Sequence, residues 1–95
     1  MDCSKVVFSQ HAFTRMFGRS VPPALVTRAI SSGEIIAEYP DDQPFPSYLL
    51  LYIEHGKALH VVVGKDKQDE ICYVVTAYWP DIDLWNDDFR TRRKK

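Results

Sequence analysis

The sequence has no apolar run approaching the roughly 20 residues that a membrane-spanning helix requires. Its first residues, Met1 to Lys5, lack the long apolar stretch of a secretory signal. We therefore expect a cytoplasmic protein without membrane contact. A chain of 95 residues suits one domain covering positions 1–95.

Cysteine is scarce, and the two that occur, Cys3 and Cys72, form neither a CxxC pair nor a metal-ligand spacing. In a reducing compartment we expect no disulfide between them. The chain also lacks a glycine-rich phosphate loop, a GxSxG elbow and an HExxH helix. Its three histidines show no ligand spacing, so a metal site that combines His11, His60 and an aspartate is not favoured, and we expect no cofactor.

The net charge of −1 conceals an uneven distribution, because the carboxyl-terminal residues 90–95 are strongly basic. Arg90 and Arg92 in this tail are candidates for binding phosphates or an acidic partner. The alternative is a frayed, disordered and solvated terminus. The charge pattern alone leaves both open.

Two helices are predicted in the amino-terminal third. Ser9 suits the N-cap of a helix from Gln10 to about Phe17, with Phe8 and Phe13 at the positions of a hydrophobic staple. A second helix should begin at Pro23. Gly33 is predicted to end it as a left-handed cap.

Four strands should follow, with Val6–Phe8 only a lead into the first helix. The apolar segments are Glu34–Tyr39, Ser47–Ile53, Ala58–Val63 and Ile71–Tyr78. The short turns between the last three predict an antiparallel meander. The order predicts an α+β fold with two N-terminal helices packed on a four-stranded antiparallel sheet, and a short C-terminal helix or turn that holds Trp85.

Alternation along the strands assigns residues to the two faces of this sheet. The face under the helices is expected to hold Leu49, Leu51, Ile53, Leu59, Val61, Val63, Tyr73 and Val75. The opposite face is expected to hold Tyr48, Tyr52, His60, Thr76 and Tyr78. That second face is rich in side chains with polar tips, which makes it the candidate site.

These residue types suit metal-free cleavage of RNA. A histidine with a pKa near neutrality, His60, can act as base or acid, and His11 can act as a second acid or base or as an orienting group. Arg15 can hold the charge that builds on the phosphate. Tyr78 would complete the catalytic set, and Thr76 and Arg19 would bind substrate with Arg90 and Arg92.

Each assignment has a structural alternative. A histidine inside an apolar strand is as often a hydrogen-bonded core residue as a catalytic one. His11 sits near a helix start, and Arg15 can pair with Glu34 or Glu38 on the surface, where such a contact contributes little.

Several segments also resemble, in the same order, a known bacterial family. They are Ser9-Gln10-His11-Ala12-Phe13-Thr14-Arg15-Met16, Gly33-Glu34-Ile35-Ile36 with Tyr39-Pro40, Pro44-Phe45-Pro46-Ser47, Leu59-His60-Val61-Val62, Thr76-Ala77-Tyr78-Trp79-Pro80, and Trp85 with Phe89-Arg90-Thr91-Arg92. The family is domain of unknown function 4258, and the resemblance covers nearly the whole chain.

The resemblance implies a fold similar to RelE-like toxins and a role as the toxin of a toxin–antitoxin pair, beside a cognate antitoxin. Toxins of that superfamily are mostly ribonucleases that use scattered Arg, Lys, His and Tyr residues. The positions that carry over are His11, Arg15, His60, Thr76 and Tyr78. The slightly acidic net charge departs from the strongly basic character of ribosome-cleaving toxins.

Three functional hypotheses follow. The first, which we favour at this point, is a metal-independent endoribonuclease of toxin type. The second is a non-catalytic module of the same fold that binds RNA or protein. The third is a homodimer formed through the second sheet face. Convergence of His60, Arg15 and Tyr78 at an open cleft would favour the first, whereas a sealed His60 would favour the others.

Overall fold

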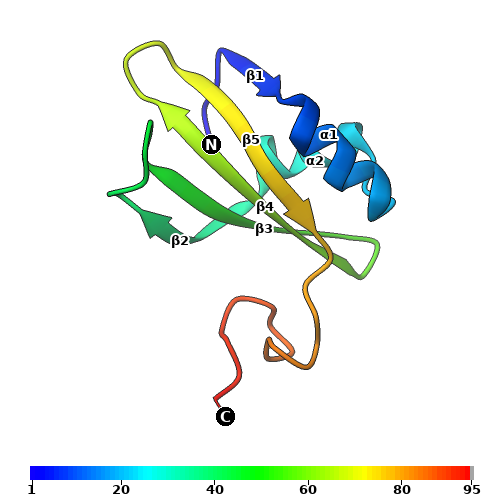
Figure 1. The fold of residues 1–95 in the computed structure, drawn as a ribbon. Helices are drawn as coiled ribbons and strands as arrows, with labels where there is room; N and C mark the ends of the chain where they lie inside the picture. The colour runs from blue at the N-terminus through cyan, green and yellow to red at the C-terminus, as the bar shows by residue number, and fades with distance from the viewer. Residues whose placement is uncertain (95) are drawn as a thin grey trace.

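The computed structural model describes residues 1–94, which form two helices and five strands (Figure 1). In chain order the elements are β1 (Lys5–Phe8), α1 (Gln10–Gly18), α2 (Pro23–Ser32), β2 (Glu34–Tyr39), β3 (Ser47–Glu54), β4 (Lys57–Asp66) and β5 (Ile71–Tyr78). The α+β class is as predicted. Within residues 1–94, no helix is long and apolar enough to cross a membrane.

The prediction of a four-stranded antiparallel sheet is wrong. The sheet has five strands in the order β1-β5-β4-β3-β2, and β1 runs parallel to β5. The extra strand is Lys5–Phe8, in which Val6 pairs with Cys72. Such a short segment carries little alternation, and its partner is remote in the chain, so no local pattern marks it as a strand. β3, β4 and β5 form the expected antiparallel meander.

The start of α1 follows the prediction. The hydroxyl of Ser9 accepts a hydrogen bond from the backbone N–H of Ala12 at 3.0 Å, and the rings of Phe8 and Phe13 stack with centroids 5.0 Å apart. The end of α2 does not follow it, because Gly33 has a φ of −73° and is extended. Glycine is needed there because a Cβ would collide with the carbonyl oxygen of Ala29.

The helices cover one face of the sheet and bury an apolar core. Met16 of α1 and Val26 and Ile30 of α2 pack against the sheet. The strand residues in this core are Leu50, Leu59, Val61, Val63, Cys72, Val74 and Ala77.

The predicted faces of β3 and of Tyr73 and Val75 in β5 are therefore exchanged, whereas Thr76 and Tyr78 lie on the predicted face with His60. Leu50 pairs with Val61, and Leu51 pairs with His60, so Leu51 lies on the face away from the helices, as does Leu49. Tyr52 packs against the core instead. A bulge beside Val63 shifts the register of β5, and Val75 is 47% exposed. Apolar residues occupy consecutive positions of both strands, so sequence alternation could not fix the register.

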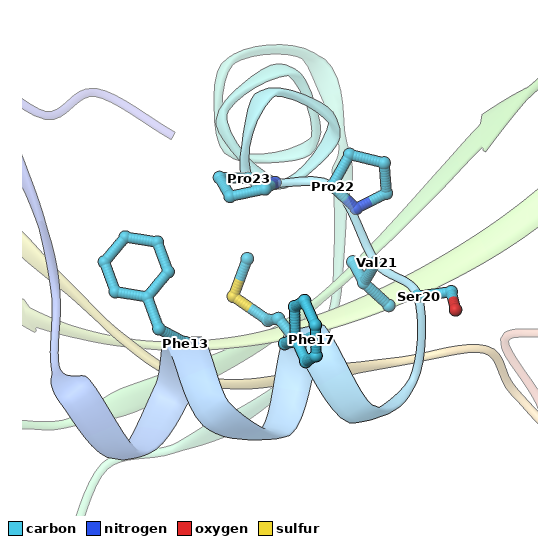
Figure 2. A pocket seen from close by; sticks show the side chains of 7 residues that line it. Phe13, Phe17, Ser20, Val21, Pro22 and Pro23 are labelled. Atoms are coloured by element: carbon cyan, nitrogen blue, oxygen red, sulfur yellow. The ribbon is translucent and has the colours of Figure 1, made fainter.

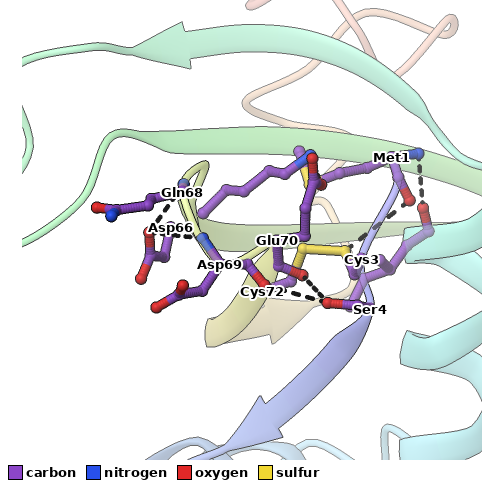
Figure 3. A network of polar contacts seen from close by, with 10 residues as sticks. Met1, Cys3, Ser4, Asp66, Gln68, Asp69, Glu70 and Cys72 are labelled. Atoms are coloured by element: carbon purple, nitrogen blue, oxygen red, sulfur yellow. Dashed lines mark hydrogen bonds and ion pairs between the residues drawn. A yellow bond between two sulfur atoms is a disulfide. The ribbon is translucent and has the colours of Figure 1, made fainter.

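The two cysteines form a disulfide, contrary to expectation. Cys3 precedes β1 and Cys72 lies in β5, with Cα atoms 5.7 Å apart (Figure 3). The parallel pairing of β1 with β5, which the sequence did not reveal, brings them together. Nearby, the hydroxyl of Ser4 donates to the carbonyl oxygens of Asp69 and Glu70, each at 3.1 Å, and this fastens the amino terminus to the turn before β5.

After β5 the chain forms turns and an isolated bridge between Trp85 and Arg92. The expected C-terminal helix or turn is thus a set of turns. This segment, residues 81–94, lies on the side of the sheet away from the helices (Figure 1). We call it the C-terminal segment.

Candidate functional site

His60 occupies the middle of β4 on the sheet face opposite the helices, and its side chain is 0% exposed. Its Nε2 lies 2.6 Å from the carbonyl oxygen of Phe89, and its Nδ1 lies 3.2 Å from the hydroxyl oxygen of Tyr78. A carbonyl oxygen can only accept, so Nε2 carries the proton and donates it. In the neutral ring Nδ1 then accepts from Tyr78. Both ring nitrogens are occupied within the protein.

The C-terminal segment encloses this imidazole. The indole of Trp85 meets its ring edge to face, with centroids 4.5 Å apart, and Phe89 supplies the carbonyl. Burial lowers the pKa of His60 below its ordinary value of 6.5, and the hydrogen bond to Phe89 opposes that change only in part. The geometry therefore makes His60 a neutral anchor for the C-terminal segment.

Tyr78, the cross-strand partner of His60, is half-buried. Burial raises the pKa of its phenol, and Tyr39 adds to the rise. The positive charges of Arg92 and Arg19 oppose it. Tyr78 therefore stays protonated as a hydrogen-bond donor, with two arginines close enough to influence it.

Arg19 links the end of α1 to β5. Its Nη1 donates to the hydroxyl of Thr76 at 2.9 Å and to the carbonyl oxygen of Ala77 at 3.1 Å. Its own carbonyl oxygen accepts from the indole N–H of Trp79 at 2.8 Å. Both acceptors of the guanidinium are neutral, so its position is fixed while its charge is not neutralised.

The structure thus brings together part of the predicted site. His60 of β4 contacts Tyr78 of the neighbouring strand β5, and Arg19 at the end of α1 contacts Thr76 of β5. His11 and Arg15 lie on the exposed side of α1 and make no hydrogen bond to that group within residues 1–94.

The arginines of the tail have different surroundings. Arg90 pairs with Glu34 at 2.7 Å, whereas Arg92 lies over the ring of Trp85 at 5.4 Å. Lys95, the last residue of the predicted basic tail, is outside the described residues.

Within residues 1–94, four cationic side chains form ion pairs with carboxylates: Arg28, Lys65, Arg90 and Arg93. In the part of the chain that the structure describes, Arg15, Arg19 and Arg92 form none. The absence of acidic partners for Arg15 and Arg19 is visible in the sequence, although no catalytic motif marks it. No aspartate or glutamate occurs between Asp2 and Glu34, so the helical layer has no acidic side chain of its own.

An apolar groove of about 640 Å³ separates α1 from α2 on the outer surface of the helices (Figure 2). Phe13, Phe17 and Pro23 line it, and Phe17 is 89% exposed. Among the described residues that line it, Ser20 alone has a polar side chain. Within residues 1–94, no three His, Cys, Asp or Glu side chains are grouped to hold a metal ion.

The chain belongs to the family described as Domain of unknown function (DUF4258), which matches residues 8–79. No curated protein and no solved structure matches it. The match covers both helices and β2 to β5, including His11, Arg15, Arg19, His60, Thr76 and Tyr78. The C-terminal segment lies beyond it. The family match does not place the chain among RelE-like toxins.

Proposed function

We propose that this member of the DUF4258 family is a non-catalytic RNA-binding protein that holds phosphates on Arg15, Arg19 and Arg92. We call these three residues the arginine surface. Arg15 lies in the last turn of α1 and Arg19 is the residue that caps its end, four positions further on. The positive charges of Arg19 and Arg92 both lower the pKa of Tyr78, against its net rise.

The observation that carries the proposal is the environment of Arg19. Its guanidinium is exposed, held by two neutral oxygens and not paired with a carboxylate within residues 1–94. An arginine fixed in this way retains donors for a phosphate oxygen and loses little side-chain entropy on binding. RNA supplies such phosphates in a regular series, and single strands also present hydroxyls and bases.

Cleavage is less well supported than binding. The endoribonuclease hypothesis needs His60 to exchange a proton with RNA, but both its ring nitrogens are occupied beneath Trp85 and Phe89. The catalytic roles of His60, Arg15, His11 and Tyr78 stay predictions. The toxin role, the cognate antitoxin and the homodimer also stay predictions, because only the resemblance or composition suggests them.

The test is fluorescence anisotropy with a labelled single-stranded RNA, in which Arg19→Gln is compared with Arg28→Gln. Arg28 is the matched control because its guanidinium already pairs with Glu54 at 2.9 Å. Removing a charged hydrogen bond to phosphate should weaken binding by about tenfold in Arg19→Gln. The slope of log affinity against log salt should fall by about 0.7 for each phosphate that the variant no longer binds.

Arg28→Gln should bind like the wild type, and gel analysis should show the RNA intact. Equal weakening in both variants would indicate a diffuse charge effect and contradict the arginine surface. If the wild type cuts the RNA and the folded His60→Ala variant leaves it intact, the ribonuclease hypothesis is restored.

A further inference from the structure

A second hollow lies on the sheet face opposite the helices. It measures about 440 Å³ and is bounded by the loop before β3 and by the middle of β4 and β5. Phe45 from the loop, Val62 and Gly64 from β4, and Tyr73 from β5 line it. This volume falls within the range of small-molecule sites.

Gly64 leaves the floor of this hollow open. It lies between Ser47 of β3 and Tyr73 of β5, and a Cβ there would have no neighbour nearer than the carbonyl oxygen of Pro46 at 4.0 Å. One wall is aromatic, because the rings of Phe45 and Tyr73 stack at 5.4 Å with an interplanar angle of 6°. A flat ring wall beside an open floor suits the face of a nucleobase.

The hollow also has a polar rim. Asp42 accepts a hydrogen bond from the hydroxyl of Ser47 through Oδ2, and Oδ1 accepts none within residues 1–94. An ionised carboxylate has further acceptor positions. Guanine is the only common RNA base that presents two adjacent N–H donors, at N1 and N2, on one edge. A bidentate contact of that kind distinguishes it from the other bases.

The hollow adjoins the arginine surface. Val62, which lines it, pairs across the sheet with Thr76, and the hydroxyl of Thr76 accepts from Arg19. Arg19, the proposed phosphate-binding residue, therefore contacts the cross-strand neighbour of a residue that lines the hollow. The hollow itself has an aromatic wall and a carboxylate at its rim. Resting on the proposed RNA-binding function, we infer that this hollow holds a guanine base of single-stranded RNA whose phosphate contacts Arg19.

The test uses two labelled single-stranded RNAs of equal length, one containing guanine and one without it. The wild type should bind the guanine-containing strand about tenfold more tightly, as expected for a bidentate base contact. Gly64→Val should obstruct the floor of the hollow and abolish this preference while leaving binding to the guanine-free strand unchanged. Asp42→Asn should reduce the preference too, and Asp41→Asn should retain it.

Circular dichroism melts verify that each variant folds. If Gly64→Val does not fold, Asp42→Asn alone tests the guanine site. Guanosine monophosphate, titrated with adenosine monophosphate as control, should shift the amide resonances of Gly64 and Tyr73. Equal binding of both strands by the wild type would overturn the guanine site and leave the proposed function intact. Absence of binding to either strand would overturn both.

Discussion

The two layers that cover the sheet differ in how they are held. The helical layer is held by apolar packing. Met16, Val26 and Ile30 contact the apolar core of the sheet and are no more than 2% exposed. The C-terminal segment is held by a few directional contacts, chiefly those that His60 makes with Phe89 and Trp85. Apolar packing spreads its stabilisation over many residues, whereas the second layer relies on a few contacts, of which those of His60 are buried and the ion pair of Arg90 with Glu34 is exposed.

Met16→Ala should have the largest effect on stability. The side chain is 1% exposed in the core between α1 and the sheet, and its removal leaves a cavity. We expect the free energy of unfolding to fall by about 2–5 kcal/mol. Urea denaturation followed by circular dichroism measures it, and a loss below about 1 kcal/mol would contradict a tightly packed core in this layer.

His60→Ala should have a smaller but more localised effect. It removes the partner of the Phe89 carbonyl and of the Tyr78 hydroxyl, and detachment of the segment then exposes both groups to water, so we expect a net loss of about 1–3 kcal/mol. The C-terminal segment should then detach, and trypsin should cut after Arg90 and Arg92 faster than in the wild type. Unchanged cleavage of a folded His60→Ala protein would show that His60 does not anchor this segment.

Arg19→Gln should change stability by about 1 kcal/mol or less, because its hydrogen bonds lie near the surface. The same urea series measures it beside Arg28→Gln. Arg19 should matter for RNA binding and little for folding. A loss as large as that of Met16→Ala would make Arg19 a structural residue instead.

The smallest effect should be a pH dependence from His60. Its pKa is lowered in the folded protein, so the unfolded chain binds the proton more readily. Its contribution is fully present above its ordinary pKa of 6.5 and is lost as the pH falls through the lower folded value. The stability difference between wild type and His60→Gln should therefore shrink on acidification. A difference that grew on acidification would contradict the neutral tautomer.

Local patterns predicted part of this structure well. The N-cap at Ser9, the stacking of Phe8 on Phe13 and the meander of β3 to β5 all depend on residues close in the sequence. Apart from the cap at Gly33, what failed depends on pairing between distant segments. The parallel strand β1, the disulfide between Cys3 and Cys72 and the face of Leu51 all follow from registers that alternation does not specify.

The same distinction applies to the site. His60 stood out as a polar residue in an apolar strand, but its contact with Phe89 joins positions 29 residues apart. The link between Arg19 and Thr76 spans 57 residues. The sequence could therefore name these residues but not separate an anchored histidine from a catalytic one.

The most direct test is an NMR titration of the full chain with a single-stranded RNA, observing backbone amides and the ring nitrogens of His60. We predict shifts at Arg15, Arg19, Thr76 and Arg92, with Arg28 and Glu54 unmoved. The His60 ring should keep its neutral form protonated at Nε2 throughout. Shifts centred on Arg28 and Glu54, or no shifts with excess RNA, would contradict binding through the arginine surface.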